Sequence, residues 1–131
     1  MVSCSIIDKF DKWLNSVNSY EVSRNKCFTS YNIYEDLNKK IWIGTDGFGA
    51  FCYNPSDDTL EWFNKNNRMP LLTVNSITQT NDGFHWFGGD DGLVRFDTTL
   101  DEIKFYNSSD GLMSNMINKN TFYKDNDILY L

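Results

Sequence analysis

One short motif occurs twice in this chain. Residues 41 to 47 read IWIGTDG and residues 85 to 92 read HWFGGDDG, so that Trp42 and Trp86 stand 44 positions apart. The agreement extends well beyond the motif, and the aligned pairs include Trp42/Trp86, Gly44/Gly88, Gly49/Gly92 and Tyr53/Phe96. Repetition at a fixed spacing of this length indicates that one supersecondary unit has been copied.

A third copy begins after the second. Residues 117 to 130 run parallel to residues 74 to 87, and the matched pairs are Val74/Ile117, Asn75/Asn118 and Asp82/Asp125. The third copy reaches the last residue, Leu131, in the middle of its own motif. The chain therefore holds two full repeats and part of another.

Each copy predicts four short β-strands. Apolar residues alternate with polar or small ones, as half-buried strands require, and Gly-rich or Asn/Asp-rich turns separate them. The predicted strands are residues 75–80, then 40–44 and 85–89, then 49–54 and 92–97, and finally 60–64 and 102–107. Four antiparallel strands in 43 or 44 residues are typical of a β-propeller blade.

The motifs resemble a known family. The segments IYEDLNKKIWIGTDGFGAFCYNP, TQTNDGFHWFGGDDGLVRFD and DGLMSNMINKNTFYKDNDILYL are similar to the two-component regulator propeller repeat. The structural residues of the repeat motif are Trp42, Gly44, Thr45, Gly49, Trp86, Gly88 and Gly92. The resemblance covers about residues 28 to 131 and places blades at about 28–72 and 73–115, with the start of a third at 116–131.

The resemblance implies a function and a location. Such repeats form the extracytoplasmic sensor propeller of hybrid two-component receptors, which detects ligands, often oligosaccharides, and controls a histidine kinase. It therefore implies signal transduction, a periplasmic location and an oligosaccharide ligand, although no signal peptide is recognisable in residues 1 to 18. Some positions depart from the pattern: Asn38 to Lys40 replace the usual Gly of the first hairpin, Gly89 replaces Thr, and Leu129 replaces Trp.

Two and a half blades are too few to close a propeller, which needs about four or more. We therefore expect either a fragment of a longer receptor or a chain whose core is completed by other blades or by a second copy.

Residues 1–27 do not fit the repeat. Their apolar residues recur at steps of three and four behind a candidate N-cap at Ser5, which predicts a short amphipathic helix. This helix is either a lid or dimerisation element, or a leader that packs on any free apolar surface.

Charge argues against several classes of partner. The net charge of −6, without any basic run, disfavours nucleic acid and anionic membranes. No continuous apolar segment of about 18 residues is present, so we expect no membrane-spanning segment.

Cys4, Cys27 and Cys52 match no zinc or redox spacing and are interpreted as reduced thiols, with a single disulfide as the alternative. No metal or cofactor is expected.

Catalytic residues are scarce. His85 is the only histidine, and it stands where the other copies have Ile41 and Ile128, which favours packing or hydrogen bonding over catalysis. The adjacent acidic residues are predicted to lie in exposed loops, where nothing raises a carboxyl pKa toward a useful range; they are Asp57/Asp58, Asp90/Asp91 and Asp101/Glu102. They also lack the spacing of a calcium loop.

Aromatic residues have two interpretations. We expect Trp42 and Trp86 to be wedges between neighbouring blades rather than sugar platforms. Only Phe48, Trp62 and Tyr106 are considered for stacking on a glycan.

Three hypotheses for the function remain. They are a non-enzymatic ligand-sensing and interaction module, a fragment of a propeller-type glycan hydrolase or lyase, and a truncated reading frame that folds only as an oligomer.

Overall fold

The computed structural model describes residues 30–119, 121–125 and 128–131. The amphipathic helix expected within residues 1–27 lies outside these residues, as do Cys4 and Cys27. Within the described part the chain is all-β, with ten strands, one short 3₁₀ helix and no α-helix.

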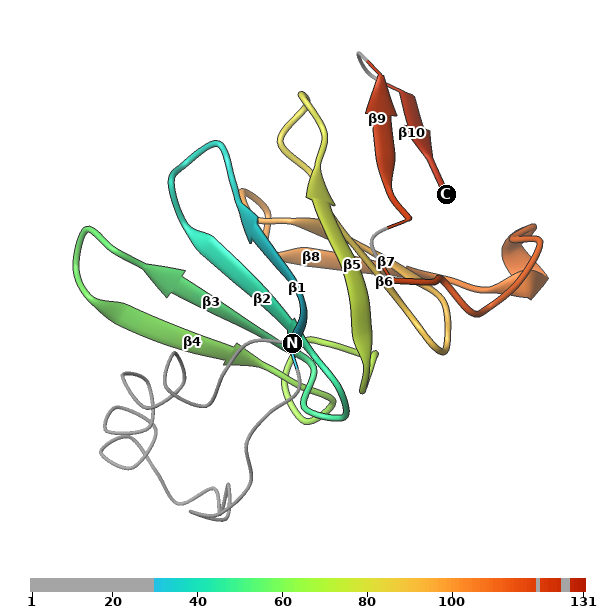
Figure 1. Ribbon diagram of the computed structural model, residues 1–131, viewed down its shortest axis with the longest axis horizontal. Coiled ribbons are helices and arrows are strands. Elements are labelled where there is room, and N and C mark those ends of the chain that lie inside the picture. Colours follow the sequence, from blue (N-terminus) through green and yellow to red (C-terminus); the bar gives the residue numbers. More distant parts are fainter. Residues whose placement is uncertain (1–29, 120, 126–127) are drawn as a thin grey trace.

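Two four-stranded antiparallel sheets dominate the structure (Figure 1). The first contains β1 (Ser30–Glu35), β2 (Ile41–Thr45), β3 (Ala50–Asn54) and β4 (Thr59–Phe63). The second contains β5 (Val74–Gln79), β6 (His85–Gly89), β7 (Leu93–Asp97) and β8 (Glu102–Tyr106). In both, each strand pairs with the next along the chain. The strands expected from the sequence are confirmed to within about one residue at each end.

The repeat extends to the strand register. Trp42 pairs with Cys52 and Trp86 pairs with Arg95, which occupies the equivalent place. The first strand of each sheet carries a register shift at the same point, between Ser30 and Asn32 in β1 and between Val74 and Ser76 in β5. Shared register and a shared bulge show that the two sheets are copies in three dimensions.

The first hairpin of each sheet turns at equivalent residues. Lys39 has a φ of 66°, and Gly83 at the same place in the second sheet has a φ of 93°. The Lys39 amide donates to the Asp36 carbonyl at 3.0 Å and the Gly83 amide donates to the Thr80 carbonyl at 2.9 Å. The absence of glycine from residues 38–40 therefore leaves a lysine in the left-handed region, where glycine is at less steric cost.

The third copy forms a smaller sheet. After the 3₁₀ helix η1 (Ser108–Asp110), β9 (Tyr123–Asp125) pairs with β10 (Ile128–Tyr130). Ile128 pairs with Asp125, whereas its equivalent, His85, pairs with Gln79. The connection in this hairpin is shorter, so the third copy does not keep the register of the first two.

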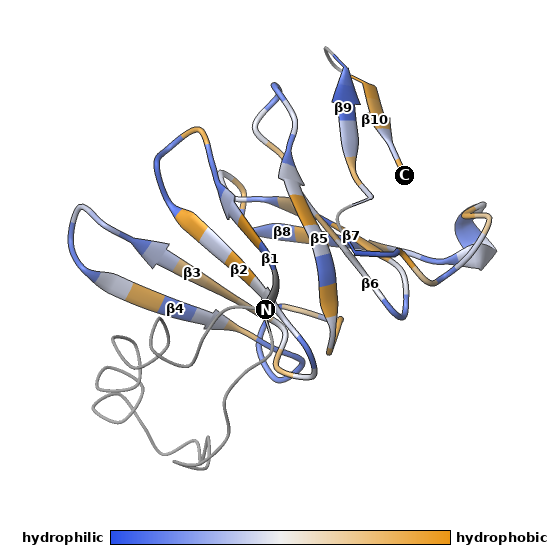
Figure 2. Ribbon diagram, in the orientation of Figure 1, coloured by the Kyte–Doolittle hydropathy of each residue, from blue (hydrophilic) through white to orange (hydrophobic). Residues whose placement is uncertain are grey.

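The sheets pack face to face, and β5 lies beside β1 (Figure 1). Apolar and polar segments alternate along the strands (Figure 2), which lets each sheet bury one set of side chains. The core between the two sheets includes Trp42, Ala50, Cys52, Phe63, Met69, Leu71, Val74, Ile77, Phe87, Val94 and Phe96. A second cluster is centred on Ile43, Phe51 and Leu60 of the first sheet.

Candidate functional site

Trp42 lies at the centre of the contact between the two sheets. Its side chain is 2% exposed, and its ring centroid lies 5.1 Å from that of Phe63, 5.0 Å from His85 and 5.2 Å from Phe87. Because Phe63 belongs to the first sheet and the other two belong to the second, the indole ring joins the sheets.

The indole nitrogen and His85 share one carboxylate. Trp42 Nε1 donates to Asp36 Oδ2 at 2.9 Å, and His85 Nε2 lies 2.9 Å from the same oxygen. The other oxygen, Oδ1, accepts hydrogen bonds from the backbone amides of Asn38 at 2.9 Å and Lys40 at 3.0 Å. Asp36 thus satisfies a turn on its own sheet and a side chain on the next.

The protonation states follow from this geometry. Burial alone would raise the pKa of Asp36, but the hydrogen bonds from Trp42, His85 and the two amides hold it below its usual value. Burial lowers the pKa of His85, and the Asp36 carboxylate offsets only part of that effect. His85 is therefore neutral near pH 7 and donates through Nε2, while Nδ1 has no hydrogen-bond partner among the described residues.

The Asp36–His85 pair is a structural element and not a reaction centre. Both side chains are about 1% exposed, so no substrate reaches them. Sequence reasoning singled out His85 but not Asp36. The repeat itself carries the missing signal: His85 replaces an isoleucine, Asp36 replaces the equivalent Thr80, and the two replacements face each other.

The contact between the second sheet and the third copy repeats the arrangement with different side chains. Trp86 Nε1 donates to Thr80 Oγ1 at 3.1 Å, as Trp42 does to Asp36. A Cβ atom on Gly44 would lie 2.6 Å from the Val74 carbonyl oxygen, and one on Gly88 would lie 2.4 Å from Ile117 Cγ2. Since Val74 and Ile117 are equivalent in the repeat, a glycine lets the next unit approach at both contacts.

The remaining motif residues shape the turns. Gly49 and Gly92 have φ values of 73° and 148°, and a Cβ on either would lie within 2.3 Å of a carbonyl oxygen of the neighbouring strand. Thr45 is buried and donates from Oγ1 to the Gly49 carbonyl at 2.8 Å. At the equivalent Gly89 a Cβ would lie 2.1 Å from the Thr73 carbonyl oxygen, which explains why threonine is replaced there.

The aromatic residues considered for glycan stacking do not form one platform. Trp62 is half-buried, stacks on Phe51 at 5.9 Å and donates from Nε1 to the Phe48 carbonyl at 2.6 Å. Tyr106 lies on the other sheet and stacks on Trp86 at 6.4 Å. These rings pack against other rings of their own sheets.

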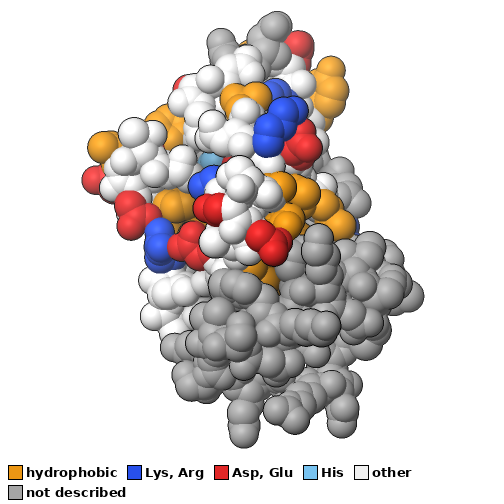
Figure 3. Space-filling model, turned by 90° about the vertical axis from the view of Figure 1, so that its left-hand side faces the viewer, with side chains coloured by type: hydrophobic (Ala, Val, Ile, Leu, Met, Phe, Trp, Pro, Cys, Tyr) orange, Lys and Arg blue, Asp and Glu red, His pale blue; other side chains and the backbone are white. Residues whose placement is uncertain are grey.

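The acidic pairs are exposed, and all of these residues lie in turns as expected except Glu102, which begins β8. Asp57 and Asp58 lie between β3 and β4, Asp90 and Asp91 between β6 and β7, and Asp101 and Glu102 at the start of β8. On the side of the molecule shown in Figure 3, acidic and basic side chains lie beside each other instead of gathering by sign.

A polar hollow of about 460 Å³ lies where the second strand of each sheet ends. Its residues come from equivalent places in the repeats: the turns after β2 and β6, and the segments that lead into the next copy. The lining residues are Asp46, Thr73, Asn75, Asp90, Met116, Asn118 and Lys119.

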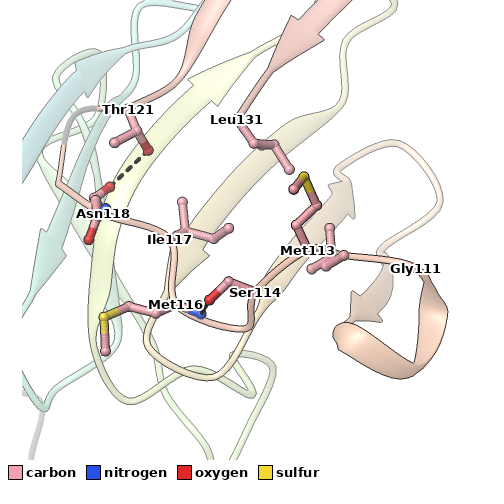
Figure 4. Close-up of a pocket in the computed structure, with 9 residues that line it drawn as sticks. Gly111, Met113, Ser114, Met116, Ile117, Asn118, Thr121 and Leu131 are labelled. Carbon is pink, nitrogen blue, oxygen red and sulfur yellow. Dashed lines mark hydrogen bonds between the residues drawn. The ribbon is translucent and has the colours of Figure 1, made fainter.

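A more apolar pocket of about 550 Å³ adjoins it and shares Met116 and Asn118. The side chains of Met113 and Leu131 point toward each other in this pocket, and Ile117 also lines it (Figure 4). Met113, Met116 and Leu131 are all more than half exposed. Leu112 also lines this pocket, and its equivalent in the first contact, Met69, is buried between two complete sheets.

Metal and membrane features are lacking in the described residues. No group of three or more His, Cys, Asp or Glu side chains in residues 30–119, 121–125 and 128–131 is placed to hold a metal ion. None of the helices described there is long and apolar enough to cross a membrane. Cys52 is a free thiol, and burial raises its pKa to about 12.

No protein-family model matches the chain, and no curated protein matches it.

Proposed function

We propose that the chain is a non-enzymatic ligand-sensing and interaction module, built from blades of a β-propeller of the two-component regulator type. One observation carries the proposal: two sheets with the same register use the same glycine, Gly44 or Gly88, to contact the next copy. Repeats that stack by one rule form extended arrays whose loop ends present successive equivalent residues to a ligand.

Other features support a binding role over a catalytic one. The single histidine of the chain is buried against Asp36, and the paired acidic residues are exposed. Acid–base catalysis on glycans needs two carboxyl groups whose environments drive their pKa values apart. The resemblance in the repeat motif favours an oligosaccharide as ligand and the periplasm as the location.

The same packing rule predicts the partners. Gly88 in the second sheet leaves room for the next unit, and Ile117 of the third copy lies close to it. We expect other propeller blades, or a second copy of the chain, to extend the array.

The test is binding together with product analysis. The purified chain is titrated calorimetrically with a panel of neutral and acidic oligosaccharides, and each mixture is then incubated for a day and analysed by chromatography. Binding with unchanged sugars supports the sensor. Released or unsaturated products would instead identify a glycan hydrolase or lyase, and a panel without any binder would overturn the sensing role.

A further inference from the structure

The contact between the two complete sheets contains a polar pair from β5 and β6. Gln79 and His85 lie directly opposite each other on these strands, and they are only 2% and 0% exposed. His85 Nε2 lies 2.9 Å from Asp36 Oδ2, in the first hairpin of the first sheet. Gln79 Oε1 accepts a hydrogen bond from the next amide of that hairpin, that of Leu37, at 2.7 Å. Two paired residues of the second unit therefore bind two consecutive residues of the first.

Each side of this contact is also held by its own sheet. Asp36 Oδ1 accepts hydrogen bonds from the backbone amides of Asn38 and Lys40, which leaves Oδ2 for side-chain donors. Gln79 Nε2 donates to the Gly83 carbonyl at 3.1 Å. Since Nε2 meets an acceptor and Oε1 meets a donor, the orientation of the Gln79 amide is settled. The groups that meet across the contact are therefore positioned largely by bonds within their own units.

The first and third units lack this polar pair. In the repeat alignment its places are taken by Glu35 and Ile41 in the first unit and by Phe122 and Ile128 in the third. Neither isoleucine can donate a hydrogen bond to a carboxylate, and the phenylalanine cannot accept one from an amide. Among the three units, the second alone offers a donor and an acceptor together at these two places.

The hairpin of the second unit does not need a donor from its neighbour. Thr80 stands where the first unit has Asp36, and its hydroxyl accepts from Trp86 Nε1 and donates to Asp82 Oδ1. Both bonds lie within the second sheet, so the hydroxyl is satisfied without the third unit. Asp36 by contrast is 3% exposed. Against an isoleucine it would be left one donor short, which is costly for a buried carboxylate.

We propose that the hairpin with Asp36 and Leu37 selects the unit that packs on the first sheet. It accepts a second unit, with its polar pair, from the same chain or from another copy, and it rejects a first or third unit. The packing at Gly44 does not make this choice, because the equivalent Gly88 is approached as closely. Where repeats could stack in several orders, a buried polar pair makes one order preferable. The inference rests on the interaction role proposed above and adds which unit this face accepts.

The experiment divides the pair between two variants of the chain, Asp36→Thr and His85→Ile. Each variant has a mismatched contact of its own, but the carboxylate of one matches the histidine of the other. Every new side chain already occurs at its place in another unit, as Thr80, Ile41 or Ile128, so we expect both variants to fold. The two proteins, one of them ¹⁵N-labelled, are unfolded in urea, mixed in equal amounts, refolded and examined by native mass spectrometry. We expect dimers that exchange units, with about ten times more heterodimer than both homodimers together, which corresponds to one buried hydrogen bond to a charged group.

The matched control mixes the parent chain with the double variant Asp36→Thr/His85→Ile. Each of these chains has a matched contact of its own, so no excess of heterodimer is expected. A random mixture of the two single variants, in which heterodimers make up half of the dimers, would overturn the selection while the association of copies stands. Folded monomers alone would overturn the selection and the association together.

A variant that refolds poorly by itself still gives an answer. Its recovery in the mixture would support the selection, and a mixture that refolds no better than the separate variants would overturn it. These outcomes do not depend on oligosaccharide binding, which tests the sensing function separately.

Discussion

Nε2 of His85 lies 2.9 Å from Oδ2 of Asp36, although 49 positions separate the two residues in the sequence. The histidine belongs to β6 of the second sheet, and the aspartate belongs to the first hairpin of the first sheet. This hydrogen bond, with that from Trp42, ties the two sheets together in a place from which water is excluded.

Replacing His85 should expose the cost of the buried carboxylate. His85→Ile copies the equivalent residue of the other repeats but leaves Asp36 one donor short, and we expect a loss of about 1–3 kcal/mol of unfolding free energy. Adding Asp36→Thr recreates the Thr80 and Ile128 combination, and the double variant should recover roughly 1 kcal/mol or more. Urea unfolding of the four proteins measures the coupling. Strictly additive losses would show that the two side chains do not stabilise each other.

The pH dependence of stability should carry the signature of the same pair. Burial holds the pKa of His85 below its usual value, so the unfolded chain binds a proton near pH 6.5 while the folded chain does not. The stabilising contribution is complete above about pH 6.5 and is lost as the pH falls through the lowered value of the folded state. The lowered pKa of Asp36 adds a further loss below about pH 4.

The measurement is the unfolding midpoint in urea between pH 7.5 and 5.5. His85 is the only histidine of the chain, so the slope in this range should vanish in His85→Ile. A slope that persists unchanged in the variant would assign it to another group.

Gly44 should resist substitution because the next unit approaches it closely. A Cβ there would lie 2.6 Å from the backbone oxygen of Val74, which is not free to move aside. We expect Gly44→Ala to reduce stability by about 1–3 kcal/mol through overpacking. Gly47→Asn is the control, because Gly47 has open space around it and a φ of 85° that asparagine tolerates. Equal thermal stability of both variants would contradict the close approach.

Cys52 should be unreactive while the sheets are packed. Its thiol is buried, and its pKa is raised to about 12, so almost no thiolate is present near neutral pH. In a Cys4→Ser/Cys27→Ser background, iodoacetamide at pH 8 is expected to label the folded chain at less than about 1% of the rate seen in 6 M guanidinium. Mass spectrometry follows the reaction, and rapid labelling of the folded chain would contradict the burial.

Lys39 occupies a position at which glycine is preferred. Its φ of 66° is positive, as is the φ of 93° at the equivalent Gly83 in the second sheet, so Lys39→Gly should raise the melting temperature by about 2–4 °C. Lys39→Ala keeps the left-handed strain and loses the exposed contact with Glu35, and it should bring no gain. Calorimetric melting of the three proteins separates the two effects.

Much of the fold could be predicted from the sequence because local patterning and repetition carry it. The alternation of apolar residues around Trp42 and Trp86 predicts strands that the structure places within about one residue of those ranges. The turn residues also follow from local chemistry, since Gly49 and Gly92 both take positive φ values. The third copy is less predictable, because the pairing of Ile128 with Asp125 depends on a short connection that the alignment does not resolve.

The candidate site could be predicted only in part. Asp90 was recognised as one of an exposed acidic pair, but its partner Asn75 and the neighbouring Asn118 carry no local signal that they share a hollow. Asp36 likewise reads as an ordinary turn residue until His85 is placed against it. In each case the contact joins different repeats.

The repeating unit, its four strands and the positions at which the chain must turn all follow from the amino-acid sequence alone. These depend on interactions among residues close together in the chain, where the hydrophobic period and glycine are sufficient guides. Which polar residues meet depends on how the units pack in three dimensions, and the contacts formed are His85 with Asp36 and Asn75 with Asp90. The reason is that these contacts join different units. The spacing of two units is set by the packing of Gly44 on Val74 and of Gly88 on Ile117.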